Sequence, residues 1–181
     1  MYPLNHTTTK SNRVVSSFAF LAVSTMLLMA PGLGEAATAT ASVGVSATVA
    51  TSCKIQQQAD VAFGTYDPTD TTPVQVNNGR IRVRCTRSAT PYAIYMGAGT
   101  GSGAACTGTP VRKMTLGTDT LNYALYQGGY TTVWGCEASN DYEYTATNNG
   151  WTNIDIYGKV PAEQDVPAGA YADTVTVTVN F

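Results

Sequence analysis

The side chains that most often carry enzymatic chemistry are scarce in this sequence of 181 residues. It contains one histidine, His6, and twelve Asp and Glu residues. A Ser-His-Asp or Cys-His nucleophile and a His-ligated zinc all require a histidine in the mature chain. A carboxylate pair can hydrolyse a bond without one, but the acids here are scattered. The residues therefore argue against an enzyme and indicate no cofactor or metal site.

The acidic residues that come closest together are better explained as solvated loops. Asp67 and Asp70 lie in a Pro/Thr-rich turn, and Asp141 and Glu143 lie among Asn and Tyr. No glycine-rich loop with a lysine follows an expected strand, so a phosphate-binding loop is unsupported. Ten Lys and Arg against twelve Asp and Glu give no basic field. Electrostatic binding of nucleic acid is therefore unfavourable.

The N-terminal residues predict a secretory signal peptide over 1–36. A polar leader with Lys10 and Arg13 precedes an apolar run over 14–29, and Gly34 and Ala36 supply the small residues that a signal peptidase needs. The alternative is a membrane anchor, but this run of 16 residues is shorter than the roughly 20 that a spanning helix requires. No other segment is apolar enough to span a membrane.

Removal of this peptide changes the chemistry of the chain that remains. The mature protein would have 145 residues, with eight basic and eleven acidic side chains and a net charge of −3. His6 would leave with the peptide, so the mature protein would contain no histidine. The case against catalysis becomes stronger.

The four cysteines of an exported chain predict two disulfides. Cys53, Cys85, Cys106 and Cys136 permit three pairings, of which the sequential one closes two loops of similar size. A metal site is the alternative, but no CxxC motif occurs and the spacings are wide. Disulfides are favoured.

The elements that position these residues are expected to be β-strands, with no convincing helix. The segment 38–50 alternates with period two, placing Val43, Val45, Ala47 and Val49 on one face. Asn77-Asn78-Gly79 predicts a tight turn, after which Arg80, Arg82 and Arg84 alternate with apolar residues. The other expected strands are 60–66, 92–96, 121–126, 131–134, 151–160 and the C-terminal stretch, in which Val175, Val177, Val179 and Phe181 share a face. Short strands separated by turn signals favour an all-β, immunoglobulin-like antiparallel β-sandwich.

Two surface features have a structural and a functional interpretation. The three arginines are better explained as the solvated face of a strand than as an anion site. The eleven tyrosines are better explained by rim and core packing than by a sugar-stacking platform.

Several sequence motifs resemble the spore coat protein U domain family, which includes the pilin subunits of archaic chaperone–usher pili. The motifs occur in the family's order from Cys53 to Phe181; they are Phe63–Pro68, Leu121–Tyr126, Thr132–Gly135, Tyr157–Pro161 and Val166–Phe181. The long polar leader and a cysteine directly after Trp134-Gly135 depart from the family pattern. The resemblance implies the sequential pairing, Cys53 with Cys85 and Cys106 with Cys136.

The resemblance also implies an incomplete sandwich that is completed by a donor strand from another subunit. Residues 37–50 would be the donor segment, with Val43, Val45, Ala47 and Val49 entering the groove, and 51–181 the pilin domain. Composition alone leaves it open whether 38–50 is a donor or an ordinary first strand; the resemblance favours donation. The edge strand with Val175, Val177, Val179 and Phe181 would pair with a chaperone strand before assembly.

The function implied by the resemblance is that of a structural subunit of a surface fimbria for adhesion and biofilm formation. Its expected partners are a periplasmic chaperone, an outer-membrane usher and neighbouring pilin subunits, and its expected route runs through the periplasm to the cell surface. The alternatives are a secreted coat protein of a spore or cyst and an adhesive module at a fibre tip. Tip adhesins of the family generally carry two such domains, whereas one is expected here.

Overall fold

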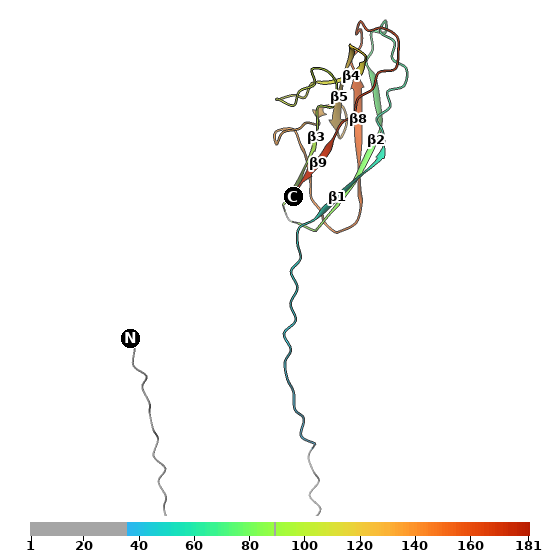
Figure 1. The fold of residues 1–181 in the computed structure, drawn as a ribbon. Helices are drawn as coiled ribbons and strands as arrows, with labels where there is room; N and C mark the ends of the chain where they lie inside the picture. The colour runs from blue at the N-terminus through green and yellow to red at the C-terminus, as the bar shows by residue number, and fades with distance from the viewer. Residues whose placement is uncertain (1–35, 89) are drawn as a thin grey trace, which may run out of the picture. The chain divides into compact units, whose positions relative to one another are not determined.

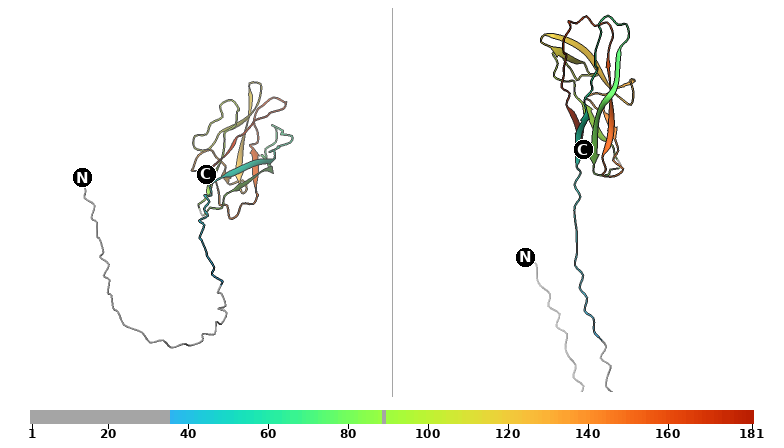
Figure 2. Two further views of the ribbon diagram at one scale, coloured as in Figure 1. Left: turned by 60° about the horizontal axis from the view of Figure 1, so that its bottom comes forward. Right: turned by 90° about the vertical axis from the view of Figure 1, so that its right-hand side faces the viewer.

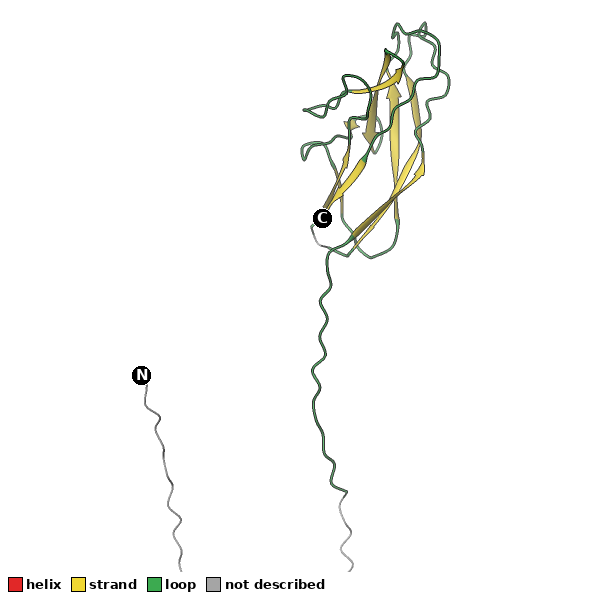
Figure 3. Ribbon diagram, in the orientation of Figure 1, coloured by secondary structure: helices red, strands yellow, loops and turns green. Residues whose placement is uncertain are grey.

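The computed structural model describes residues 36–88 and 90–181, and these residues contain strands and no helix (Figures 1 and 3). Nine strands occur within this part of the chain: β1 (Cys53–Ala59), β2 (Val74–Cys85), β3 (Tyr92–Met96), β4 (Arg112–Leu116), β5 (Asp119–Gln127), β6 (Thr132–Val133), β7 (Tyr142–Tyr144), β8 (Thr152–Val160) and β9 (Val177–Asn180). They belong to the unit formed by residues 46–181.

The strands form two antiparallel sheets, whose layers can be followed in Figure 2. The larger sheet has the order β1-β2-β8-β5-β4, and β6 also pairs with β5. The smaller sheet has the order β7-β3-β9. This arrangement confirms the expected all-β, immunoglobulin-like sandwich.

The core lies between the inward faces of the two sheets. Ile81 and Val83 of β2 face Ile94 and Met96 of β3, and all four are at most 3% exposed. Trp134 is completely buried, and its indole Nε1 donates a hydrogen bond to the Ile94 carbonyl at 2.7 Å. Because a buried indole N–H needs a partner, this bond ties the larger sheet to the smaller one.

The two ends of the sandwich differ in what they carry. We call the end formed by Cys53, Cys85 and Thr152 the base, because β1, β2 and β8 meet there in register. We call the opposite end the apex; it is formed by the loops 60–73, 117–118 and 161–170. The Tyr66 hydroxyl donates to the Pro161 carbonyl at 3.1 Å, which joins two of the apical loops.

Several predicted strands are confirmed. The strands over 92–96 and 151–160 occur as β3 and β8, and the hairpin around Gly128-Gly129 joins β5 to β6. The alternation after residue 79 is also confirmed, since Ile81, Val83 and Cys85 are buried.

The tight turn predicted at Asn77–Gly79 is wrong. β2 runs through these residues, and a register shift between Val76 and Gly79 marks a β-bulge against β8. The Asn78 side chain accepts from the Ala62 amide and donates to the Ala62 carbonyl. Asn78 and Gly79 therefore form a bulge that bends one long strand. Asn and Gly are common in both tight turns and bulges, so their presence alone does not distinguish the two.

The strand predicted over 60–66 is also wrong, because the first strand ends at Ala59 and 60–66 is a loop. The sequence CKIQQQA of β1 carries three consecutive glutamines and no strict apolar alternation. Sequence reasoning also missed β4 and β7, which are only five and three residues long. Register with neighbouring strands, rather than local pattern, defines these elements.

The disulfides are Cys53–Cys85 and Cys106–Cys136, as the family resemblance implied. Cys53 and Cys85 are opposite one another in the β1–β2 ladder. Cys106 and Cys136 link the loop before β4 to the loop after β6, with a Cα–Cα distance of 5.7 Å. The described part of the chain contains no free cysteine.

The predicted signal peptide over 1–36 and His6 fall almost entirely outside the described residues, which begin at residue 36. Within the described ranges, no helix is long and apolar enough to cross a membrane.

We predict that the Cys53–Cys85 bridge contributes substantially to the stability of the sandwich. Replacing both cysteines with serine is expected to lower the free energy of unfolding by about 3–4 kcal/mol, because the bridge constrains the unfolded chain. Denaturant unfolding followed by Trp fluorescence measures this change. Non-reducing peptide mapping that joined Cys53 to Cys136 would contradict the pairing.

Candidate functional site

The functional feature of this sandwich is a pair of strand edges that have no partner in the described residues. β1 pairs with β2 on one side, and β9 pairs with β3 on one side. In each case the other edge is free. Free backbone N–H and C=O groups along an edge are a template for pairing with another strand.

A groove of about 710 Å³ lies between these edges. Its walls come from β1 and the loop after it, and from the segment that leads into β9. Its apolar lining consists of Ile55, Ala59, Val61, Phe63, Ile81, Met96, Met114, Leu125, Ile156, Val175 and Val177. The groove is therefore bounded by backbone edges and lined by these hydrophobic side chains together with the polar residues Gln56, Gln57, Asp60, Asp173 and Thr174.

The floor of the groove is the core itself. Ile81, Met96 and Leu125 line the groove and also belong to the buried cluster between the sheets. One more strand at this position would cover Ile55, Val61 and Val175, which line the groove and are only half-buried. The geometry is that of a core left open along one seam.

The C-terminal stretch forms one wall of the groove. Val175, Val177 and Val179 are half-buried and pack against the core, which confirms that they share a face. Phe181 lies just beyond β9 and is 63% exposed. The expected face is therefore shorter than the sequence indicated, because β9 ends at Asn180.

The segment before β1 is extended and exposed, unlike the sandwich that follows it. Residues 36–52 form no strand and no ladder, and Val43, Val45 and Val49 are 84%, 93% and 82% exposed. Ala47 is exposed as well. This row of apolar residues on an extended chain has no packing partner within the described ranges.

A polar cluster closes the apical end of the groove wall. The Tyr123 hydroxyl donates to Asp173 Oδ2 at 2.6 Å, and the Thr100 and Thr174 amides donate to Asp173 Oδ1 at 2.7 Å each. Burial alone would raise the pKa of Asp173, but the hydrogen bonds from Tyr123, Thr100 and Thr174 outweigh it and lower that pKa. Burial, together with Asp173, raises the pKa of Tyr123.

Arg112 of β4 lies beneath this cluster and is 1% exposed. Its Nη2 donates to the carbonyls of Met96 and Trp134 at 2.6 Å each, and Nε donates to the Gly97 carbonyl at 2.8 Å. Burial lowers its pKa to about 10, and Tyr123 and Asp173 oppose this shift. The guanidinium therefore stays charged at neutral pH and fastens the smaller sheet to β4. Nothing in the sequence pattern had singled out Arg112.

This arrangement is suited to binding a polypeptide strand rather than to turning over a substrate. The groove offers backbone donors and acceptors on both rims and apolar side chains between them. Strand addition uses these features, since main-chain hydrogen bonds give affinity and alternate side chains fill pockets.

An immunoglobulin-like sandwich with such an open seam belongs to the pilin-like class of structural domains. The sequence matches the Spore Coat Protein U domain over residues 39–178. The chain therefore belongs to the spore coat protein U domain family. Membership confirms the resemblance inferred from the motifs, and it places the chain among structural, non-enzymatic proteins.

A curated relative and a solved structure extend this likeness. The chain is 33% identical over 179 residues to Protein U of Myxococcus xanthus, covering 90% of this chain and 95% of that protein. It is 31% identical to a chain in the CsuC–CsuE chaperone–tip adhesion subunit pre-assembly complex from archaic chaperone–usher Csu pili of Acinetobacter baumannii. That match has a TM-score of 0.50 and covers 74% of this chain but 40% of the matched chain.

We predict that the Asp173 cluster makes stability depend on pH in the acidic range. Because the folded-state pKa of Asp173 is lowered from its ordinary value of 3.8, its contribution is present above about pH 4 and is lost as pH falls further. Asp173→Asn should therefore lower the free energy of unfolding by about 1 kcal/mol at pH 7, and by less at about pH 2.5.

Urea unfolding of the variant and the original chain at both pH values measures this difference. Asp70→Asn is the control, since the exposed Asp70 side chain accepts no hydrogen bond within the described residues. A gap for Asp173→Asn that stayed constant with pH would contradict the assignment.

Proposed function

We propose that this protein is a structural subunit of a surface pilus that polymerises by donor-strand complementation. The groove between the free edges of β1 and β9 carries this proposal. The likeness to a chain of a chaperone–subunit complex from archaic pili supports it. In this account, residues 37–50 of one subunit fill the groove of its neighbour.

The donor segment has the form that the groove requires. It lacks proline and charge, and its apolar residues alternate with small polar ones. Alternation places Val43, Val45, Ala47 and Val49 on the groove side and Gly44, Ser46 and Thr48 on the outer side. A proline would remove a ladder hydrogen bond, and a buried charge would be costly.

The energetics favour a stable joint between subunits. Burial of the three valines contributes roughly 1.5–3 kcal/mol each, and each new backbone hydrogen bond adds about 0.5–1.5 kcal/mol. Ordering the segment costs about 1–2 kcal/mol per residue, which offsets part of the gain. The added strand also covers Val61, Phe63 and Val175, half-buried residues that line the groove, so the acceptor subunit gains burial as well.

The open groove must be covered before assembly. An uncovered edge with the Thr/Val alternation of β9 is an aggregation hazard. A periplasmic chaperone would lend a strand to the edge with Val175, Val177, Val179 and Phe181, and an outer-membrane usher would exchange it for the next subunit's donor segment. The fibre on the cell surface would serve adhesion and biofilm formation.

A second candidate is a coat protein of a spore or cyst. The 33% identity to Protein U across most of both chains favours it, as does the family's description as a spore coat domain. The same groove would then join subunits in a coat. Immunogold labelling separates the two sites, since a pilus subunit lies on thin fibres of growing cells and a coat protein on resistant cells.

We predict that deletion of 37–50 leaves a subunit that accepts a donor strand but cannot supply one. The purified chain is expected to form ladders that survive detergent at room temperature and dissociate only on heating. The deleted chain should remain a soluble chaperone-bound monomer, should form no ladders, and should terminate growth when mixed with the full chain. Normal ladders from the deleted chain would contradict the donor assignment.

We predict that Val45→Asp blocks assembly and that Ser46→Asp does not. A carboxylate in a hydrophobic pocket remains unpaired, so the rate or yield of polymer should fall on the order of a hundredfold or more. Ser46 is the matched control, because its side chain would lie on the opposite face of the same strand. Gel analysis of unheated samples measures the polymer, and equal effects of the two substitutions would contradict the expected register.

A further inference from the structure

The base of the sandwich carries a group of cationic side chains with no carboxylate partner among the described residues. On the outer face of the larger sheet, Lys54 of β1 is directly opposite Arg84 of β2. Arg82 lies two residues before Arg84, and Arg87 follows β2. Within the described ranges the ion pair closer than 4.0 Å is Arg80–Asp155, which leaves these four cations unpaired. We call them, with Trp151, the basal patch.

The basal patch is a shaped surface rather than a set of loose charges. The guanidinium carbons of Arg82 and Arg84 lie 4.6 and 5.0 Å from the centroid of the Trp151 ring, one ring holding both arginines. Lys54, Arg84 and Arg87 also line a hollow of about 570 Å³. Stacking on the indole keeps the arginine planes in place, so their donors are preorganised toward solvent.

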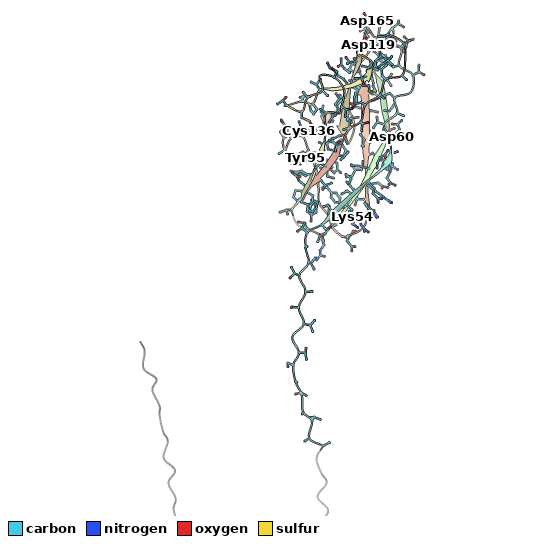
Figure 4. All side chains as sticks on the ribbon, in the orientation of Figure 1. Lys54, Asp60, Tyr95, Asp119, Cys136 and Asp165 are labelled. Atoms are coloured by element: carbon cyan, nitrogen blue, oxygen red, sulfur yellow. A yellow bond between two sulfur atoms is a disulfide. The ribbon has the colours of Figure 1, made fainter. Side chains whose placement is uncertain are left out.

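The apex carries the opposite charge. Five exposed carboxylates lie in its loops and in the turn that begins β5; they are Asp67, Asp70, Asp119, Glu163 and Asp165. Gln164 joins the loop 161–170 to β5, because its side chain accepts from the Asn122 amide and donates to the Asn122 carbonyl. Lys159 near the end of β8 is the cation closest along the chain to this group. Figure 4 shows Asp119 and Asp165 at one end of the sandwich and Lys54 at the other.

The direction of the groove relates these two ends. Ala172, which precedes β9, forms a β-bridge with Thr115 of β4 near the apex. From there the chain runs along β3 as β9 and ends beside Ala93, close to Tyr92 at the base. A strand added antiparallel to β9 therefore runs from base to apex, and its C-terminal end leaves at the apex. The donor segment continues into Cys53 at the base of its own sandwich. An antiparallel donor thus brings the base of one subunit to the apex of the next.

We infer that the basal patch binds the acidic apex of a second copy of this chain, and that this contact orients and speeds fibre assembly. The inference rests on the proposed function. Opposite charges meet if the donor strand is antiparallel to β9, whereas a parallel donor would place two basal patches together. Charge complementarity of this kind raises association rates and suppresses wrong orientations.

Charge reversal at exposed positions tests the inference. The basal variant carries Lys54→Glu with Arg87→Glu, the apical variant carries Asp119→Lys with Asp165→Lys, and a third chain carries all four substitutions. None of these four side chains makes a hydrogen bond within the described residues, and all four are exposed. Ser139→Lys is the control, since it adds positive charge at an exposed loop residue close to Cys136, which lies between the two ends in Figure 4.

The initial rate of ladder formation by the purified full chain is measured at about 20 mM and about 500 mM salt. We expect the original chain to assemble about tenfold faster at low salt, because salt screens exposed charges beyond a few ångströms. The basal and apical variants should each lose most of this advantage, and the control should keep it. The chain with all four substitutions should also lack it, because opposite charges then nearly cancel within the basal patch and within the apex.

The outcomes separate this inference from the proposed function. Salt-independent assembly at equal rates in every variant would overturn the inference and leave donor-strand assembly standing. Absence of ladders from the original chain would count against the proposed function itself. If the basal variant lost binding to a sulfated polysaccharide but assembled at the original rate, the patch would belong to a polyanion, which also overturns the inference.

Discussion

The free edges of β1 and β9 constrain every other feature of this molecule. A β-sandwich is stable when each inward face is covered, and here the groove between the free edges leaves Val61, Phe63 and Val175 only half-buried. The chain meets this constraint partly by internal means. Trp134 and Arg112 fasten the smaller sheet to the larger one by hydrogen bonds to Ile94, Met96 and Gly97. One disulfide joins β1 to β2, and the other joins the loop before β4 to the loop after β6.

The same constraint explains the N-terminal segment. Residues 36–52 carry exposed valines without a partner in the described chain, and the groove offers apolar pockets without an occupant. In the proposed assembly, the exposed valines of one subunit fill the groove of its neighbour. Opposite charges at base and apex would then add direction to a joint that hydrophobic burial alone leaves unoriented, because burial is not directional.

Much of the architecture follows from local pattern. The strand over 92–96 and the hairpin around Gly128-Gly129 were predictable because alternation and glycine turns are local signals. The shared apolar face of Val175, Val177 and Val179 was predictable for the same reason. The bulge at Asn77–Gly79 was not, since Asn-Gly serves both turns and bulges, and only the register with β8 distinguishes them.

The features that sequence reasoning missed depend on long-range contacts. β1 gains its strand character from pairing with β2 through the Cys53–Cys85 position, although three of its seven residues are glutamine. Arg112 gives no local signal, because its role is set by carbonyls from Met96 and Trp134 that are distant in the chain. The basal patch needed the placement of Trp151 beside Arg82 and Arg84, which period-two alternation alone does not give.

The most direct test of the central claim is the structure of the assembled fibre by electron cryomicroscopy. The account predicts that residues 43–49 of one subunit lie as a strand between β1 and β9 of its neighbour, antiparallel to β9, with Val45 facing the groove. A fibre in which these residues fill the groove of their own subunit, or lie outside any groove, would contradict it.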